Sequence, residues 1–223
     1  MVEEYISLFR TGIANVMDSP IVKLSQSLRK KLLKFGTPEW FERICISTEE
    51  YLRIGVLGAV DVWRNKNPYT IDNYMLNREY DSGVYTCIDM VEIVADIDLS
   101  AEVRNDRRVQ KLRKLTARHV AFTNDLYSYN KEVPKHANPN NLVYLLMHWK
   151  KLSFDESVSE IVKIINSDME SFLQLKKEVL SDERCTSVSL QKYIAGMEHW
   201  MSGNIDWSIQ TSRYKVNAPA ILV

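Results

Sequence analysis

The chain has 223 residues, of which 45% are hydrophobic and 26% charged, and this length and composition suit a single globular domain with a buried core. Lys plus Arg equals Asp plus Glu, at 29 each, so no basic excess indicates a nucleic-acid partner or an anionic membrane surface. The N-terminus has no apolar run of signal or membrane length, and Cys45, Cys87 and Cys185 lie far apart. We therefore expect a cytoplasmic protein without a membrane span or a disulfide framework.

Helical periodicity continues along the sequence, and no stretch shows sustained period-two alternation. The predicted fold class is therefore all-α. In chain order, the predicted helices cover residues 2–17, 21–35, 38–64, 71–81, 84–95, 106–132, 141–148, 153–180 and 189–210, with a short helix after Ser100 and a C-terminal tail over residues 215–223.

Capping and breaking residues define several of these ends. Gly36 ends one helix and Thr37-Pro38 begins the next, while Val133-Pro134 is predicted to stop the long helix. Gly55 and Gly58 indicate close helix packing, with room for a ligand as the alternative. In the second helix the apolar positions predicted to face inward are Leu24, Leu28, Leu32 and Phe35.

The pattern between residues 71 and 95 is interrupted at Asp81-Ser82-Gly83, because a glycine inside a helix costs about 1 kcal/mol relative to alanine. Arg78, just before this break, would by default form a surface salt bridge with Asp81 or Asp72. His119 lies about 140° from Asn124 around its helix, so we expect it to be packed or exposed rather than a ligand. A solvated face is the interpretation of the basic run Arg107, Arg108, Lys111, Arg113, Lys114 and Arg118.

Asn124, Ser128 and Glu132 are spaced four and four residues apart, which places them on one stripe of an α-helix. Their amide, hydroxyl and carboxylate oxygens are hard donors that suit Mg²⁺, an ion that leaves its other positions to water and substrate phosphates. Lys131 lies beside Glu132 and could neutralise a phosphate oxygen. The spacing alone is also typical of a solvated helix face.

The stretch from Asn124 to Glu132, with Asp125 second and Lys131-Glu132 last, resembles the second metal-binding motif of class I terpene synthases of the microbial type. Arg78, 46 residues before Asn124, resembles the diphosphate sensor of that family. Near the C-terminus, the family's terminal pattern is matched by Trp200, Gly203, Trp207, Arg213 and Tyr214. The three matches are collinear and span nearly the whole chain.

The resemblance implies Mg²⁺-dependent ionisation of a prenyl diphosphate of the geranyl or farnesyl type, followed by cyclisation or elimination with release of diphosphate. Of the three Mg²⁺ ions in the family, one would bind Asn124, Ser128 and Glu132. The implied diphosphate contacts are Arg78, Lys131, Arg213 and Tyr214. Asp81 would link the sensor Arg78 to the helix break, where the Ser82 carbonyl would lie near the cation. Pocket-lining roles are implied for Tyr74, Tyr85 and Trp207, with simple core packing as the alternative.

The family's aspartate-rich motif has no counterpart, since no Asp-Asp pair occurs in the sequence. We therefore expect an N-terminally incomplete terpene synthase bundle over residues 1–223, with exposed apolar surface and little cyclase activity of its own. Two alternatives stay open. One is a catalytically inactive remnant, and the other is a helical interaction protein that docks a partner through an exposed apolar face. A homodimer is also compatible with the sequence.

Overall fold

The structure is a computed structural model that describes residues 2–13, 19–65, 67–183 and 187–214. Cys185 and the predicted tail over residues 215–223 lie outside the described residues. Within the described part of the chain every regular element is helical, which confirms the all-α prediction. None of the described helices is long and apolar enough to cross a membrane.

The elements follow one another along the chain as a series of α-helices with one π-helical turn, η1, and one 3₁₀ turn, η2. They are α1 (Val2–Thr11), α2 (Pro20–Phe35), α3 (Pro38–Glu50), η1 (Tyr51–Val56), α4 (Leu57–Asn65), α5 (Ile71–Asp81), α6 (Val84–Asp89), α7 (Val91–Val94), α8 (Ala101–Asn105), α9 (Arg107–His136), α10 (Leu142–Lys150), α11 (Phe154–Leu180), α12 (Val188–Gln210) and η2 (Ser212–Tyr214).

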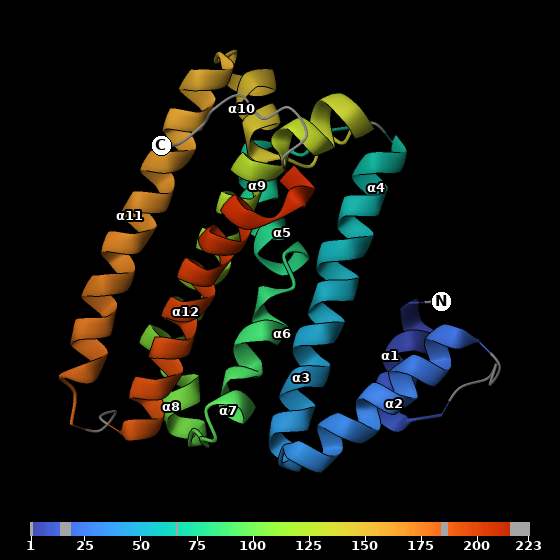
Figure 1. The fold of residues 1–223 in the computed structure, drawn as a ribbon, viewed down its shortest axis with the longest axis vertical. Coiled ribbons are helices and arrows are strands. Elements are labelled where there is room, and N and C mark those ends of the chain that lie inside the picture. The colour runs from blue at the N-terminus through green and yellow to red at the C-terminus, as the bar shows by residue number, and fades with distance from the viewer. Residues whose placement is uncertain (1, 14–18, 66, 184–186, 215–223) are drawn as a thin grey trace.

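Helix α9 is the centre of the bundle and contacts α5, α6, α10, α11 and α12 (Figure 1). Its N-terminal half contributes Val109, Leu112 and Leu115 to a core shared with α6, α7, α11 and α12. Its C-terminal half contributes Ala121 and Phe122 to a second core with α5, α10 and α11. A third apolar cluster joins α1, α2 and α3. The fold therefore holds the two halves of α9 against different sets of helices, with α11 common to both.

Three predictions about the helices are wrong. Helix α1 ends at Thr11, because Gly12 has a left-handed backbone with φ +81°. Pro134 does not stop α9, which continues to His136. A proline near the end of a helix removes only one backbone hydrogen bond, and the helix ends where Ala137 adopts φ +50°.

The apolar stripe of α2 is the third correction. Leu24, Leu28 and Phe35 are 69%, 43% and 66% exposed, and only Leu32 of the four is buried. Helix α2 instead meets α1 through Arg29, whose guanidinium donates to the carbonyl oxygens of the last turn of α1. Periodicity identifies an apolar stripe, but it does not say whether another element covers that stripe.

The basic run of α9 is not a solvated face either, because most of its side chains pair with carboxylates on neighbouring helices or just after α11. These pairs are Arg108 with Asp182, Arg113 with Asp89, Lys114 with Glu79, and Arg118 with Asp168. The run therefore attaches α9 to α5, α6 and α11.

Close packing explains both glycines in the long run before residue 65. A Cβ atom on Gly55 would lie 2.6 Å from the Cα of Asp81, and one on Gly58 would lie 2.5 Å from the Nδ2 of Asn77. The predicted role of these glycines is confirmed, and it brings η1 and α4 directly against α5.

Candidate functional site

The predicted interruption after Arg78 is confirmed. Helix α5 ends at Asp81, Ser82 caps it, and Gly83 takes a left-handed φ of +68° before α6 begins at Val84. The Ser82 hydroxyl donates to the Glu79 carbonyl and accepts from the Val84 N–H. This turn places the ends of two short helices beside α9.

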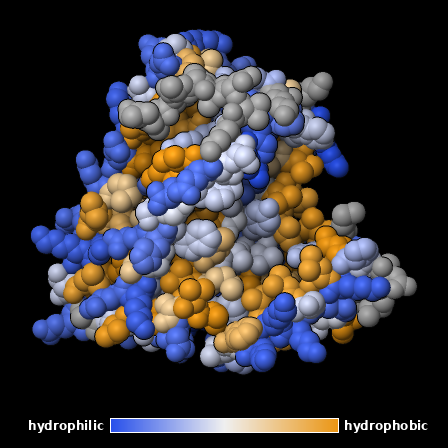
Figure 2. All heavy atoms as spheres, viewed as in Figure 1, coloured by the Kyte–Doolittle hydropathy of each residue, from blue (hydrophilic) through white to orange (hydrophobic). Residues whose placement is uncertain are grey.

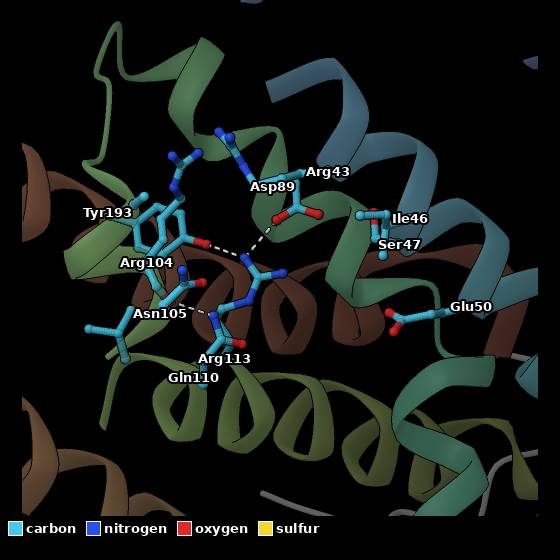
Figure 3. A pocket seen from close by; sticks show the side chains of 12 residues that line it. Arg43, Ile46, Ser47, Glu50, Asp89, Arg104, Asn105, Gln110, Arg113 and Tyr193 are labelled. Carbon is cyan, nitrogen blue, oxygen red and sulfur yellow. Dashed lines mark hydrogen bonds and ion pairs between the residues drawn. The ribbon is translucent and has the colours of Figure 1, made fainter. Parts of the chain in front are cut away.

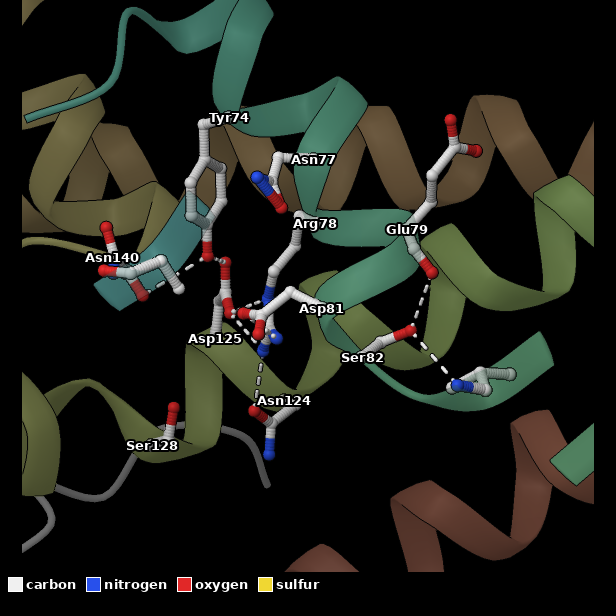
Figure 4. A network of polar contacts seen from close by, with 12 residues as sticks. Tyr74, Asn77, Arg78, Glu79, Asp81, Ser82, Asn124, Asp125, Ser128 and Asn140 are labelled. Carbon is white, nitrogen blue, oxygen red and sulfur yellow. Dashed lines mark hydrogen bonds and ion pairs between the residues drawn. The ribbon is translucent and has the colours of Figure 1, made fainter. Parts of the chain in front are cut away.

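The Arg78 side chain is 11% exposed and turns toward α9 (Figure 4). Its Nη2 donates to Asn124 Oδ1 and to Asp125 Oδ1, both at 2.9 Å, and its Nε donates to Asp125 Oδ1 at 3.0 Å. Its Nη1 reaches Asp81 Oδ2 at 3.3 Å. The default salt bridge with Asp81 is therefore present, but it belongs to a buried network that joins α5 to α9 rather than to the surface.

Asp125 is the residue on which this network converges, and our sequence reasoning gave it no role. It is fully buried, and its Oδ2 accepts from the Tyr74 hydroxyl at 2.6 Å and from the Leu142 N–H at 3.0 Å. Burial raises the pKa of the Asp125 carboxyl, although Arg78 and these donors favour its charged form. The sequence feature that could have drawn attention to Asp125 is that it is the only aspartate between Asn124 and Glu132.

The three predicted metal ligands lie on one stripe of α9. Ser128 Oγ donates to Glu132 Oε2 at 2.9 Å, and Ser128 is fully buried. Asn124 is held at both ends, because its Oδ1 accepts from Arg78 while its Nδ2 donates to the Tyr214 hydroxyl at 2.7 Å. The network therefore brings Arg78, Asn124 and Tyr214 together from α5, α9 and η2.

The donor chemistry of this stripe fits a magnesium ion. An amide carbonyl oxygen and a hydroxyl each keep a lone pair beyond the bonds described here, and a carboxylate has a second oxygen. Within the described residues no three His, Cys, Asp or Glu side chains form a metal cluster of their own. The mixed oxygen set of Asn124, Ser128 and Glu132 is accordingly the candidate that the hard-donor preference of Mg²⁺ supports.

The other predicted contact residues differ in exposure. Tyr214 is buried, whereas Arg213 is exposed and places its guanidinium 5.8 Å from the Tyr214 ring centroid. Lys131 is partly exposed and forms no ion pair with the described residues. Tyr74 is 2% exposed in the core, and the Tyr85 hydroxyl donates to Glu79.

An apolar cavity of about 950 Å³ lies between α6–α7 and α12. It is lined by Cys87, Met90, Val91, Val94, Ala95, Lys192, Ala195, Gly196, His199, Trp200, Gly203, Asn204 and Trp207. Trp207 also packs edge-on against Tyr214, with ring centroids 5.7 Å apart. The chain of contacts Trp207–Tyr214–Asn124 thus connects the apolar cavity to the polar network, whereas Tyr74 and Tyr85 are not among the residues that line this cavity. Figure 2 shows further apolar side chains in the region of α4. Leu57 and Trp63 of this helix are exposed.

Comparison with known proteins gives a family match over most of the chain. The sequence model of the family described as terpene synthase family 2, C-terminal metal binding, matches residues 9–171. The chain is 28% identical over 212 residues to germacrene A synthase of Nostoc punctiforme, covering 95% of this chain and 65% of that protein. It is 30% identical to terpene synthase 1 of Physarum polycephalum, covering 97% of this chain and 66% of that protein. The chain thus spans about two thirds of the length of these curated relatives.

Solved structures show the same fold. The linalool/nerolidol synthase of Streptomyces clavuligerus in complex with 2-fluorogeranyl diphosphate superimposes with a TM-score of 0.83 at 21% identity, covering 93% of this chain and 72% of that one. The 2-methylisoborneol synthase of Streptomyces coelicolor A3(2), in complex with Mg²⁺ and 2-fluoroneryl diphosphate, gives a TM-score of 0.83 at 18% identity, covering 97% of this chain and 69% of that one. At these identities the likeness supports the fold, and the predicted helical bundle is confirmed.

Proposed function

This chain belongs to terpene synthase family 2, and we propose that its function is the Mg²⁺-dependent ionisation of a prenyl diphosphate followed by cyclisation or elimination. The observation that carries the proposal is the contact chain from Arg78 through Asn124 and Tyr214 to Trp207. Through Tyr214 and Trp207 the polar network around Arg78 and Asn124 is connected to the apolar cavity, and this supports a substrate with one anionic and one apolar part, such as a prenyl diphosphate.

The oxygens of Asn124, Ser128 and Glu132 would hold a Mg²⁺ ion. When bound, the metal supplies positive charge that stabilises the departing diphosphate more in the transition state than in the ground state. Ser128 is buried and already bonded to Glu132, so the two side chains are oriented before a ligand arrives. Such preorganisation lowers the cost of binding.

Three cationic side chains would contact the diphosphate in this proposal, and they differ in whether a carboxylate already balances their charge. Lys131 and Arg213 form no ion pairs within the described chain, so their charges are available to a diphosphate. Arg78 is balanced by Asp125 and touches both Asn124 and Asp81. Because Asp81 is the last residue of α5, a diphosphate that binds Arg78 would compete with the Arg78–Asp81 contact. It would thereby affect the helix break where Ser82 lies.

The apolar cavity would receive the prenyl chain. Its volume falls within the range of about 300–1,000 Å³ that is usual for small-molecule sites. Its lining is largely apolar, and the ring of Trp207 offers a π face to positive charge. Val94 and Trp207 are 82% and 50% exposed, so the cavity is open to solvent on this side. Both the geranyl and the farnesyl type of substrate are compatible with the proposal.

Activity with purified protein tests the proposal. Because we expect little cyclase activity of this chain alone, incubation with geranyl or farnesyl diphosphate should release diphosphate slowly, with small amounts of terpene products detected by gas chromatography and mass spectrometry. These products should disappear when EDTA removes Mg²⁺. Glu132→Gln removes a charged ligand and should lower kcat/KM at least about a hundredfold, since metal stabilisation is worth several kcal/mol.

The matched control is Glu170→Gln, which makes the same change on an exposed position of α11 and should leave turnover unchanged. Equal activity of Glu132→Gln and the unmodified chain would remove the metal role from this stripe. Absence of any Mg²⁺-dependent product from either substrate would count against the proposed reaction for this polypeptide.

A further inference from the structure

A second cavity, of about 390 Å³, lies on another side of α6 and is polar rather than apolar (Figure 3). Side chains from α3, α6, α8 and α9 line it together with Tyr193 of α12. Its charged side chains are Arg43, Glu50, Asp89, Arg104 and Arg113. None of the proposed metal or diphosphate residues belongs to its lining, so it is separate from the site described above.

Two of the three arginines are held by carboxylates. Arg113 Nη1 reaches Asp89 Oδ1 at 2.6 Å and also contacts the Tyr193 hydroxyl. Arg43 Nη2 reaches Glu92 Oε1 at 2.9 Å, and Glu92 is itself buried. Arg104, in contrast, forms no ion pair with the described part of the chain.

Buried guanidinium N–H groups without acceptors are the unusual feature of this cavity. Arg43 Nε and Arg104 Nη1 are both buried and have no hydrogen-bond partner among the described residues. A buried donor without an acceptor costs about 1–3 kcal/mol, and more when the group is charged. In the view of Figure 3 both guanidinium groups lie on the same side of the cavity, and the charge of Arg104 has no carboxylate partner within the described residues.

We propose that this cavity binds a small ligand through a phosphate or carboxylate group that accepts from Arg43 and Arg104. Such an oxyanion supplies acceptors for both unpartnered N–H groups and balances the charge of Arg104. The cavity volume exceeds the size of one phosphate group, and the amide of Gln110 and the hydroxyl of Tyr193 are polar partners for the rest of the ligand. The inference does not depend on the proposed terpene synthase activity.

Glu50 is an acidic residue on the side of the cavity opposite Arg43 and Arg104. It lines the cavity away from the two guanidinium groups in Figure 3 and forms no hydrogen bond or ion pair with the described residues. Burial raises the pKa of its carboxyl. A negative charge here opposes a bound anion, so the oxyanion belongs at the Arg43 and Arg104 side.

Isothermal titration calorimetry on the purified chain tests the proposal, with inorganic phosphate and citrate as separate ligands, without Mg²⁺ and at low, constant ionic strength. Saturable binding of phosphate alone would assign a phosphate ligand, and binding of citrate alone a carboxylate ligand. Arg104→Gln should weaken the binding by about tenfold or more, since a hydrogen bond to a charged group contributes on this order. No saturable binding of either anion would overturn the proposal.

Two further variants keep the test independent of folding defects. Arg107→Gln removes the same charge from an exposed position outside the cavity and should bind like the unmodified chain. Glu50→Gln keeps both arginines and should tighten binding severalfold, because it removes a repelling charge. Equal affinity of Arg104→Gln and the unmodified chain, or weaker binding by Glu50→Gln, would show that the anion binds elsewhere and would overturn the assignment.

Discussion

Asp125 shows at the level of one residue how the candidate site depends on a group outside the proposed ligand stripe. It accepts from Arg78, Tyr74 and Leu142, which belong to α5 and α10, while its own position is on α9. A single carboxylate thus joins three helices and balances the one buried arginine of the network. Its role is to position Arg78, and through Arg78 also Asn124.

Asp125→Asn should lower the free energy of unfolding by about 3 kcal/mol or more. The amide keeps the shape of the side chain but leaves the buried Arg78 charge without its main counter-ion, and breaking a buried pair on one side carries a cost of this size. Urea denaturation followed by circular dichroism measures the loss.

The comparison variant for this prediction is Asp81→Asn. Its carboxylate meets Arg78 at 3.3 Å and is 25% exposed, so we expect a loss below about 1 kcal/mol. Similar losses in both variants would mean that Asp125 does not carry the Arg78 charge.

His119 is a second residue with a measurable consequence. It is 6% exposed on α9, its Nδ1 has no partner among the described residues, and burial lowers its pKa from the usual 6.5. The unfolded chain therefore takes up a proton more readily than the folded chain. This contribution to stability is fully present above the unfolded pKa and is lost as the pH falls below it.

We expect the free energy of unfolding to decrease between pH 7.5 and pH 5.5, and His119→Gln to reduce that decrease. Urea denaturation at the two pH values gives the difference for each protein. His199→Gln, at an exposed histidine of α12, serves as the reference and should keep the pH dependence of the unmodified chain. A pH dependence unaffected by His119→Gln would contradict the prediction.

At the level of elements, the π-helical turn η1 and the end of α5 approach each other at Gly55. A Cβ atom there would lie 2.6 Å from Asp81 Cα and 2.7 Å from Asp81 N, and neither backbone atom can rotate away. A π-helical turn inside a longer helix is frequent at functional sites, and this one lies against the helix break after Arg78. The approach sets the distance between α5 and its neighbour.

Gly55→Ala should lower the free energy of unfolding by about 1–3 kcal/mol, because overpacking forces the two elements apart. Gly203→Ala is the matched substitution, since an added methyl group on α12 meets no atom within 4 Å. There we expect a gain of up to about 1 kcal/mol from the better helix propensity of alanine. Thermal and urea denaturation measure whether the two substitutions change the free energy of unfolding in opposite directions. An unchanged free energy of unfolding in Gly55→Ala would contradict the close packing of η1 against α5.

For the whole molecule, the proposed function makes Mg²⁺ and diphosphate linked ligands of one network. Together they should raise the Tm by about 5 °C or more at a hundredfold excess over Kd, since that excess stabilises by about 2.7 kcal/mol and each kcal/mol shifts a domain of this size by about 2–4 °C. Differential scanning fluorimetry with each ligand alone and with both measures the linkage.

Chelation of the metal by EDTA should remove most of this stabilisation, and Glu132→Gln should abolish the joint effect while Glu170→Gln retains it. Equal shifts with diphosphate in the presence and absence of Mg²⁺ would indicate that the diphosphate binds without the metal.

The sequence by itself determined the helical class, most helix ends and the order of the motifs. Thr37 caps α3 as its sequence predicts, and Thr70 and Ser153 cap α5 and α11 in the same way, because an N-cap bond involves only residues three apart in the chain. The break at Gly83 and the stripe on α9 follow in the same way from local spacing. Family membership also depends only on the order of residues, and the family match confirms it.

Only the tertiary structure decided which side chains meet. The Asp125 contacts, the pairing of the basic run and the exposure of α2 involve helices far apart in the sequence, and helical periodicity carries no information about which neighbour covers a face. The polar cavity around Arg104 likewise needs residues from five elements. Burial and charge balance arise from the packing of whole helices, so these features appear only when the bundle is assembled.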